Sequence, residues 1–402
     1  MLSFEVARAR LLEDVPVLAG ERVPVEHGCG RVLAEDVVAR GPLPPFAYSA
    51  MDGYVVASGE LGGDGPWELA VEGESRAGRP APAFAARSAC AISTGAEVPA
   101  GADAVLPREV VERTANHIRF GERPRAGQHI RRAGEDLAAG AVALARGLRL
   151  GPAALGLAAA LDVTELSVAR RPRVTILCTG DELRVPGSAA IPGKIPESVS
   201  PGLAALATLA GATVRRLPPV GDEREATERA IAAALAETDL LLTVGGVSVG
   251  EHDWVRPALE AQGVALDFWK VAIKPGKPLA FGRHQAGTAA VLGLPGNPAS
   301  ALITFSLFGM PLLRALQGDR AAVPAFVALP LAAPLVHKPG RLEFVRVALE
   351  PREGRLSVVP FDNQASGALT SMAWSSGLAL LGADVEMLAT GSFVEVLRFQ
   401  DL

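Results

Sequence analysis

Strand-like and helix-like segments alternate between Arg171 and Leu316, and this alternation limits the fold more than any other feature of the chain. Apolar runs of strand length, such as VTILCTG and DLLLTVGG, are separated by stretches with helical spacing, such as EREATERAIAAALAE. Such alternation predicts an α/β unit whose mostly parallel sheet is covered on both faces. Within it, we expect helices near 202–210 and 299–316.

Polar residues and glycines follow the predicted strands at their carboxyl ends. Ligands bind beside the carboxyl ends of strands in open α/β sheets, so we expect these residues to meet at one edge. They are Asp181 and Glu182 after VTILCTG, Asp222 after TVRRLPPVG, Gly245, Gly246, Glu251 and Asp253 around LTVGGVSVG, and Pro295, Gly296, Asn297 and Pro298 after AAVLGL.

Three lysines, Lys270, Lys274 and Lys277, lie in the otherwise apolar segment DFWKVAIKPGKPLAFG. Lysine is rarely buried without a partner. If residues 268–274 are extended, Lys270 and Lys274 project from one face. Together with backbone N–H groups of the glycine loop, the lysines would form a cradle for phosphate or another oxyanion.

Carboxylates beside lysines suit a magnesium-assisted reaction at a phosphoanhydride, because oxygen ligands hold Mg²⁺ while it bridges phosphates. The alternative is structural, since networks of ion pairs imitate functional clusters. In that case the lysines pair with Asp222, Glu251 or Asp253 and only support the fold.

A serine hydrolase is a second hypothesis. The sequence GVSVG around Ser248 matches the G-x-S-x-G nucleophile elbow between a strand and a helix, and Asp267 and His284 follow in the required order. However, GRHQAG around His284 has the composition of a turn, and a hydrolase mechanism does not account for the three lysines. A pattern with three fixed positions also arises often by chance.

The first half of the chain has a different pattern of apolar residues, glycines and prolines. Residues 3–18 carry apolar side chains at helical spacing, whereas residues 23–132 show short β-like runs separated by glycine and proline. A helix is predicted at 151–163, with Pro152 near its start. A chain of 402 residues is long enough for roughly two to four domains.

Composition excludes several classes of protein. A formal charge of −5 argues against nucleic-acid binding by bulk electrostatics. The three cysteines form no CxxC or Cys/His cluster. The charged N-terminal segment differs from a signal peptide, and no uncharged apolar run reaches the ~20 residues of a spanning helix. We therefore expect a cytoplasmic protein with no membrane or nucleic-acid partner.

Seven motifs stand in order along nearly the whole chain, and together they resemble the molybdopterin molybdenumtransferases, the MoeA family related to the gephyrin E domain. They are SAMDGYVV (49–56), STGAEVP (93–99), IRRAGED (130–136), CTGDEL (178–183), GGVSVGEHD (245–253), FWKVAIKPGKPLAFG (268–282) and GLPGNPAS (293–300).

This resemblance implies a multidomain α/β plus β protein with four regions. They are a discontinuous helical and linker domain (1–44 and 134–170), an inserted β-rich domain (45–133), an α/β molybdopterin-binding domain (171–320) and a small C-terminal β domain (321–402). The resemblance also implies a homodimer that takes adenylated molybdopterin and molybdate, uses Mg²⁺, and yields molybdenum cofactor and AMP. Molybdopterin adenylyltransferase and molybdoenzyme acceptors are the further partners it suggests.

The same resemblance assigns roles to individual residues. Catalytic roles fall on Asp52, Thr94, Glu182, Asp222, Asp253, Lys270 and Lys274. Metal binding falls on Glu182, Asp222 and Asp253. Substrate binding falls on Asp136, Gly245, Gly246, Ser248, Lys277, Pro295 and Pro298. Asp52 and Thr94 would reach the site from the β-rich domain of the other subunit, with Asp136 supporting that side. Without the resemblance, Asp52 before Gly53 is better explained as a hairpin turn, and IRRAGED as an exposed charged loop.

One segment departs from the family pattern. Where the family shows a segment like G-x-I-x-D-S-N, this chain has GKIPESVSPG at 193–202. Glu197 can replace the acid, but Val199 replaces an amide, and losing one such polar contact costs about 0.5 to 1.5 kcal/mol. A paralogue with another substrate or a preference for tungstate is therefore an alternative.

The last 80 or so residues are β-like. A polar turn at 363–367 is expected either to approach the site or to form a surface loop. In the family this domain also contacts other proteins, so a scaffold without enzymatic activity is the other alternative.

Overall fold

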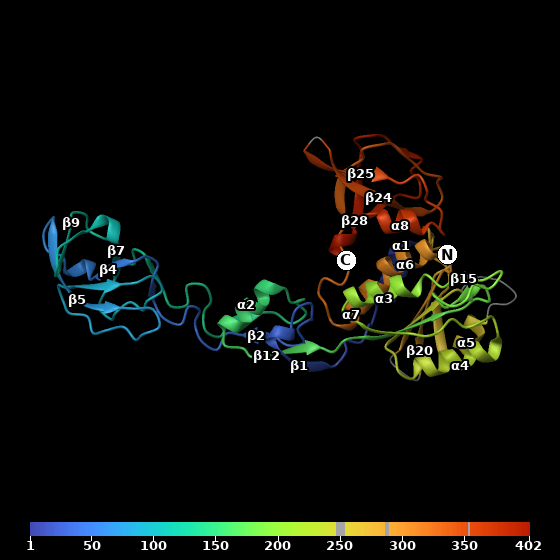
Figure 1. Cartoon of the computed structure of the whole chain (residues 1–402), viewed down its shortest axis with the longest axis horizontal. Helices are drawn as coiled ribbons and strands as arrows, with labels where there is room; N and C mark the ends of the chain where they lie inside the picture. Colours follow the sequence, from blue (N-terminus) through green and yellow to red (C-terminus); the bar gives the residue numbers. More distant parts are fainter. Residues whose placement is uncertain (247–253, 286–288, 353) are drawn as a thin grey trace.

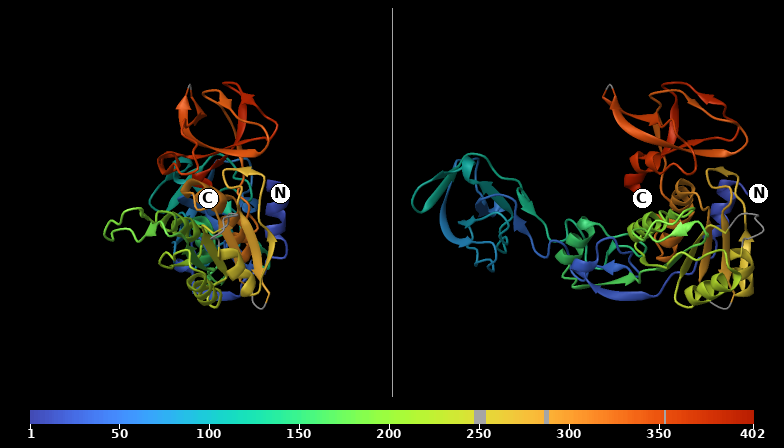
Figure 2. Two further views of the ribbon diagram at one scale, coloured as in Figure 1. Left: turned by 90° about the vertical axis from the view of Figure 1, so that its right-hand side faces the viewer. Right: turned by 45° about the vertical axis from the view of Figure 1, so that its right-hand side comes forward.

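The computed structural model describes residues 1–246, 254–285, 289–352 and 354–402. The chain is elongated, with a β-rich lobe at one end and the α/β and C-terminal β units at the other, joined by a slender middle region (Figures 1 and 2). The predicted fold class is confirmed. The domain limits stay a prediction.

The α/β unit is built on a six-stranded sheet. Its strands, in spatial order, are β16 (Thr213–Arg216), β13 (Arg173–Cys178), β17 (Leu240–Val244), β21 (Ala290–Leu294), β20 (Ala280–His284) and β18 (Val264–Phe268). The first four strands are parallel, and β20 and β18 are antiparallel additions at one side. The predicted, mostly parallel sheet is thus confirmed.

Helices cover both faces of this sheet, as the alternation predicted. On one face lie α3 (Ser200–Leu209), α6 (Pro298–Thr304), the π-helical turn η4 (Phe305–Gly309) and α7 (Met310–Leu316); on the other lie α4 (Arg224–Leu235) and α5 (Val255–Ala261). Leu240, Leu242 and Val244 pack toward the first face and Leu241 toward the second, as the two-residue period of a strand requires.

The predicted helix at 299–316 exists, but η4 widens its middle. Pro311 lacks an N–H group and cannot complete a regular helical hydrogen bond, which explains a π turn just before it. By length and composition Pro298–Leu316 could cross a membrane, but 89% of its apolar window is buried inside the protein. It is a core helix.

The N-terminal helix α1 (Phe4–Leu12) is shorter than predicted. The backbone leaves helical geometry at Glu13, which is extended, and Asp14 has a positive φ of 49°, so the helix ends well before Pro16. Its apolar side chains Phe4, Ala7 and Leu11 are buried in the core of the α/β unit. The first residues of the chain therefore support a sheet that begins near Arg173.

The middle region consists of short pairings between distant segments. β1 (Gly20–Pro24) pairs with β12 (Glu165–Ala169), and β2 (Val37–Val38) pairs with β11 (Val142–Leu144). The helix α2 (Pro152–Ala160) packs beside them, with Pro152 at its start as predicted.

The β-rich lobe contains a six-stranded sheet. Its strands, in spatial order, are β7 (Ala104–Pro107), β4 (Gly53–Val56), β6 (Ala89–Ile92), β5 (Trp67–Ser75), β9 (His117–Phe120) and β8 (Glu112–Arg113), and β3 (Tyr48–Ser49) pairs with β10 (Ile130–Arg131) outside it. A Cβ at Gly53 would lie 1.9 Å from the Leu106 carbonyl oxygen, so only glycine fits where β4 meets β7.

The C-terminal unit stacks beside the α/β unit (Figure 2). Its sheet runs β19 (Ile273–Lys274), β24 (Leu342–Arg352), β26 (Gly377–Leu381), β28 (Phe393–Arg398) and β22 (Val327–Pro330), with β25 (Arg355–Pro360) on β24. The remaining elements are β14 (Leu183–Arg184) with β15 (Ile195–Pro196), β23 (Leu335–Val336) with β27 (Met387–Leu388), α8 (Leu369–Trp374), and the 3-10 turns η1 (Val25–His27), η2 (Ser58–Glu60), η3 (Arg108–Val110) and η5 (Phe399–Asp401).

The expectation of continuous extended backbone at 268–274 is wrong. β18 ends at Phe268, Val271 forms a bridge with Leu2, and β19 begins at Ile273 and pairs with β24. These partners are distant in sequence, so local pattern carries no sign of them.

The Asp239 carboxylate, just before β17, links the amino ends of β17 and β13 through hydrogen bonds. This buried carboxylate accepts two hydrogen bonds from the Arg170 guanidinium, at 2.7 and 2.8 Å, and one from the Arg173 N–H group at 2.8 Å. Burial alone would raise the pKa of Asp239, but these bonds outweigh it and lower the pKa to about 2.

We predict that Asp239→Asn lowers the free energy of unfolding at pH 7 by about 2 kcal/mol, the value of a pKa depressed by nearly two units. A depressed pKa stabilises the fold above the unfolded value near 3.8 and is lost as the pH falls toward 2. Urea unfolding of the variant and the wild type should therefore converge near pH 2. The exposed pair of Glu237 with Arg215 supplies the control, because Glu237→Gln should cost less than about 1 kcal/mol. An equal loss at both sites would contradict the prediction.

Candidate functional site

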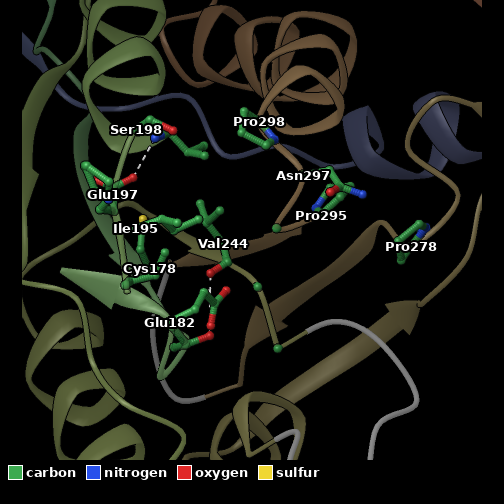
Figure 3. A pocket seen from close by; sticks show the side chains of 17 residues that line it. Cys178, Glu182, Ile195, Glu197, Ser198, Val244, Pro278, Pro295, Asn297 and Pro298 are labelled. Atoms are coloured by element: carbon green, nitrogen blue, oxygen red, sulfur yellow. Dashed lines mark hydrogen bonds between the residues drawn. The ribbon is translucent and has the colours of Figure 1, made fainter. Parts of the chain in front are cut away.

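A cavity of about 460 Å³ opens at the carboxyl edge of the α/β sheet. Its wall comes from the ends of β13, β17 and β21, from the segment 195–199, and from the start of α6 (Figure 3). Five of the predicted site residues line it: Glu182, Gly245, Gly246, Pro295 and Pro298. The expectation that the strand ends meet at one edge is confirmed for these residues.

The glycines at the end of β17 have both the backbone angles and the close contacts that require glycine. Gly245 and Gly246 have φ values of +85° and +64°. A Cβ at Gly245 would lie 2.6 Å from the Thr179 carbonyl oxygen, and one at Gly246 would lie 2.2 Å from a Val255 methyl group. Backbone therefore forms this side of the cavity, as an anion cradle needs.

The predicted metal ligands are only partly described. Glu182 is exposed and lines the cavity, whereas Asp222 is not among the lining residues. Asp222 is linked to Asp181, the neighbour of Glu182: the Asp222 N–H donates to the Asp181 carboxylate at 3.1 Å, and the Asp181 N–H donates to the Asp222 carboxylate at 3.4 Å. Asp253, Glu251 and Ser248 lie outside the described residues. Within the described residues, no three His, Cys, Asp or Glu side chains gather as a ready metal site.

This donor set has the chemistry for Mg²⁺, which usually takes one or two carboxylates and completes its shell with water and substrate phosphates. Glu182 and Asp222 are the described residues that would hold it. The hydrogen bonds between Asp181 and Asp222 also show what Asp181 does. It links two strand-end loops through these hydrogen bonds.

Glu197 has a structural task that the sequence analysis missed. It is 5% exposed, and its carboxylate accepts hydrogen bonds from the Val199 N–H (2.6 Å), the Ser200 N–H (2.7 Å) and the Ser200 hydroxyl (2.6 Å). It thereby caps the N-terminus of α3. Burial would raise the pKa of Glu197, but the bonds from Ser200 and Val199 hold it below its usual value. An acid just before Ser200-Pro201, at the start of a predicted helix, was the available signal.

Part of the cavity wall is formed by the apolar Val199 and Val244 and by Cys178, beside the capping carboxylate of Glu197. Val199 is buried and lines the cavity where the family pattern has an amide. Burial, followed by the nearby Glu197 carboxylate, raises the pKa of the Cys178 thiol, so the thiol stays protonated at neutral pH. A bound ligand therefore meets a methyl-rich wall and a neutral thiol here.

Lys274 has an acidic partner that the sequence did not indicate. The Lys274 ammonium lies 2.9 Å from a Glu343 carboxylate oxygen, and the two residues are also paired in register between β19 and β24. Glu343 is buried and accepts a second contact from Nδ1 of buried His337. The alternative pairing with Asp222 is not seen; Glu251 and Asp253 fall outside the described residues.

The other two lysines remain open to ligands. Lys270 and Lys277 are exposed, and neither forms an ion pair with any residue that the structure describes. Lys277 immediately precedes Pro278, which lines the cavity. The polar turn at 363–367 also approaches this region, because the Ala299 N–H at the start of α6 donates to the Ser366 carbonyl oxygen.

The geometry argues against the hydrolase. His284 is the last residue of β20, not part of a turn, and it pairs beside Val264 at the amino edge of β21. Gly245 and Gly246 leave the opposite edge of the sheet, roughly 13 Å away along a five-residue strand. Asp267 pairs with Arg10 at 3.2 Å.

Asp52 and Thr94 come together on the β-rich lobe. One carboxylate oxygen of Asp52 accepts the Thr94 N–H at 2.7 Å and the Thr94 hydroxyl at 3.0 Å. These bonds, with a smaller contribution from Arg108, lower the pKa of Asp52. Asp136 is not part of this pair. It is exposed, and its N–H donates to the Leu43 carbonyl oxygen. The lobe lies at the far end of the molecule from the cavity (Figure 1).

Comparison with known proteins places these features in one family. Family models match the MoeA N-terminal region (domain I and II) at residues 2–161, a probable molybdopterin binding domain at 175–315, and the MoeA C-terminal region (domain IV) at 328–399. The chain belongs to the MoeA family. Its members named molybdopterin molybdenumtransferase include those of Haemophilus influenzae, 36% identical with both chains fully covered, and Synechococcus elongatus, 40% identical over 98% of this chain and 99% of the other.

A solved structure agrees over the whole length. The molybdopterin biosynthesis moeA protein of Pyrococcus horikoshii has a TM-score of 0.86 and 28% identity, covering 99% of this chain and 100% of that one. The elongated MoeA arrangement of this chain, with the β-rich lobe remote from the α/β sheet, is therefore shared with a relative.

We predict measurable coupling between Lys274 and Glu343 in this MoeA protein. In a double-mutant cycle of Lys274→Met and Glu343→Gln, the coupling should be about 1 kcal/mol in the free energy of unfolding, because the carboxylate is buried while the lysine is half exposed. Glu343→Gln alone should cost about 1 to 3 kcal/mol, since His337 also loses its charged partner.

The control is the exposed pair of Arg229 and Glu225, whose coupling should stay below about 0.5 kcal/mol. Strict additivity of the Lys274 and Glu343 substitutions would show that the contact contributes nothing to stability.

Proposed function

We propose that this protein inserts molybdenum from molybdate into adenylated molybdopterin, releasing AMP and forming molybdenum cofactor. Membership of the MoeA family supports the reaction class. The observation that carries the proposal to this chain is the cavity at the carboxyl edge, where Glu182 and the backbone of Gly245 and Gly246 face the end of the lysine segment at Pro278.

The residues divide the task by their chemistry. The backbone N–H groups of the glycine loop and the ammonium groups of Lys270 and Lys277 suit the phosphates of the substrate, because both stabilise negative charge. Lys274, held by Glu343, suits molybdate as a positioned cation. Glu182 and Asp222, with Asp253, would hold Mg²⁺, which stabilises charge on the phosphoanhydride while it is cleaved.

Val199 and Cys178 form one part of the cavity wall, and we assign this part to the pterin of the substrate. A flat heterocycle packs against such a wall without needing an amide partner. Reduced affinity for molybdopterin, or a preference for tungstate, is the alternative that this substitution favours. A scaffold without catalysis is less favoured, because it has no use for the acidic and lysine residues at the cavity.

The proposed active site needs a second copy of the chain. Asp52 and Thr94 form a polar pair at one end of the molecule, and Glu182 lies at the other end (Figure 1). A homodimer in which each β-rich lobe reaches the α/β sheet of its partner would join them. We place this enzyme in the cytoplasm, between an adenylyltransferase that supplies the substrate and the molybdoenzymes that accept the cofactor.

The first test follows AMP release from adenylated molybdopterin with Mg²⁺, with and without molybdate. We expect molybdate-dependent release, and a loss of at least about a hundredfold in Lys274→Ala and Asp222→Asn, as is typical when one group that stabilises developing charge is removed. Arg229→Ala, an exposed cation on α4, should keep full activity. Binding of the nucleotide without release by the wild type would instead identify a divergent binder.

The second test asks whether the site is shared between subunits. Inactive Asp52→Asn and Lys274→Ala proteins, mixed and allowed to exchange subunits, should recover up to about a quarter of wild-type activity, because half of the dimers are mixed and each has one intact site. If the site lies within one chain, mixing restores nothing.

A further inference from the structure

We propose that the protein carries a second anion site, for a small oxyanion such as phosphate, where the middle region meets the end of α7. A cavity of about 440 Å³ lies there, and Arg149, Arg314, Asp319 and Arg320 supply most of its charged lining. This volume falls within the ~300 to 1,000 Å³ typical of small-molecule sites. None of the lysines of the proposed active site lines it.

Arg314 carries the inference. It is in the last turn of α7 and only 8% exposed, yet its guanidinium forms no hydrogen bond or ion pair with any residue in the described ranges. Its Nε is sealed from solvent without an acceptor. A buried charge without a partner is strongly unfavourable, so such groups normally pair with a protein acid or bind an ion. Burial, then the neighbouring Arg149, lowers the pKa of Arg314.

The neighbouring acid is already occupied. The Asp319 carboxylate accepts the Arg149 Nε at 2.9 Å and the Ala321 N–H at 2.9 Å. Only one of the two remaining nitrogens of the Arg149 guanidinium group has a hydrogen-bond acceptor. Nη1 donates to the Gly30 carbonyl oxygen at 2.8 Å, whereas Nη2 is buried without a partner.

The other charged residues of the cavity, Arg320 and Asp401, do not neutralise the positive charge of Arg149 and Arg314. Asp401 also lines the cavity, but its two oxygens take the Arg398 guanidinium at 2.6 and 3.0 Å. Arg320 is exposed at the cavity and has no acid partner among the residues that the structure describes. The cavity therefore holds an excess of guanidinium groups, which match the oxygens of phosphate-like anions better than any other side chain.

The site joins two parts of the fold. Arg149 belongs to the middle region and Arg314 to the α/β unit, and these two parts of the chain are in close contact beside the cavity. The Arg320 N–H donates to the Gly147 carbonyl oxygen at 3.0 Å, and a Cβ at Gly147 would lie 2.8 Å from the Arg320 side chain. An anion bound between Arg149 and Arg314 would neutralise both guanidinium groups and fasten this junction.

The test measures melting temperature against inorganic phosphate at constant ionic strength, with chloride as the replaced anion. In the wild type the melting temperature should rise and then saturate, as binding to the folded state requires. Arg314→Met keeps most of the side-chain volume and removes the charge. We expect this variant to lose the rise, and to melt no lower than the wild type without phosphate, because it no longer buries an unpaired charge.

Two controls separate this site from other cations. Lys274→Ala removes a lysine of the proposed active site, and Arg229→Met removes an exposed arginine of α4; both should keep the phosphate response. Repeating the titration with sulfate and with molybdate shows which size and charge of tetrahedral oxyanion the site prefers.

The proposal is overturned if the wild type shows no saturable rise, or if Arg314→Met keeps the rise, or if Lys274→Ala loses it. Should Arg314→Met fail to fold, Arg320→Gln at the exposed rim replaces it. That variant should weaken phosphate binding by about tenfold, the loss expected for one charge-assisted hydrogen bond. An unchanged affinity there would count against the site. Because the readout is stability, the result stands whether or not AMP release is observed.

Discussion

The register of three parallel strands is the constraint on which the site depends. Cys178, Val244 and Leu294 are level with one another across β13, β17 and β21, so the chain leaves all three strands at the same edge. A slip of one residue would turn every side chain of a strand to the opposite face. Because Leu240, Leu242 and Val244 bury one face and Leu241 the other, the packing of the core fixes the position of the cavity.

The C-terminal unit holds part of the lysine segment in place. The lysine segment leaves the α/β sheet after Phe268, and β24 of the C-terminal unit holds it again at Ile273 and Lys274. The same strand supplies Glu343, which balances the Lys274 charge. In the proposed active site, an incoming oxyanion would compete with the buried Glu343 carboxylate for the Lys274 ammonium group.

Sequence reasoning succeeded where local pattern and side-chain periodicity decide the outcome. The alternation in the α/β unit predicted the sheet, its covering helices, and the meeting of Glu182, Gly245, Gly246 and Pro295. It failed where the partner is distant: no pattern near Lys274 indicates Glu343, and none near Val271 indicates Leu2. It did not predict that Glu197 caps α3, because a carboxylate that caps a helix and one that binds a ligand look alike in sequence.

The bridge between Leu2 and Val271 has a consequence for how the chain is made. The Leu2 N–H donates to the Lys270 carbonyl oxygen, and the Ala272 N–H donates back to Leu2. During synthesis, Leu2 cannot form these hydrogen bonds until Lys270 and Ala272 have been made. By then the middle region, the β-rich lobe and most of the α/β sheet have already been synthesised. Contacts of such high sequence separation form late and slowly. The lysine segment, which pairs with Leu2 and with β24, can therefore reach its final conformation only after both ends of the chain have been made.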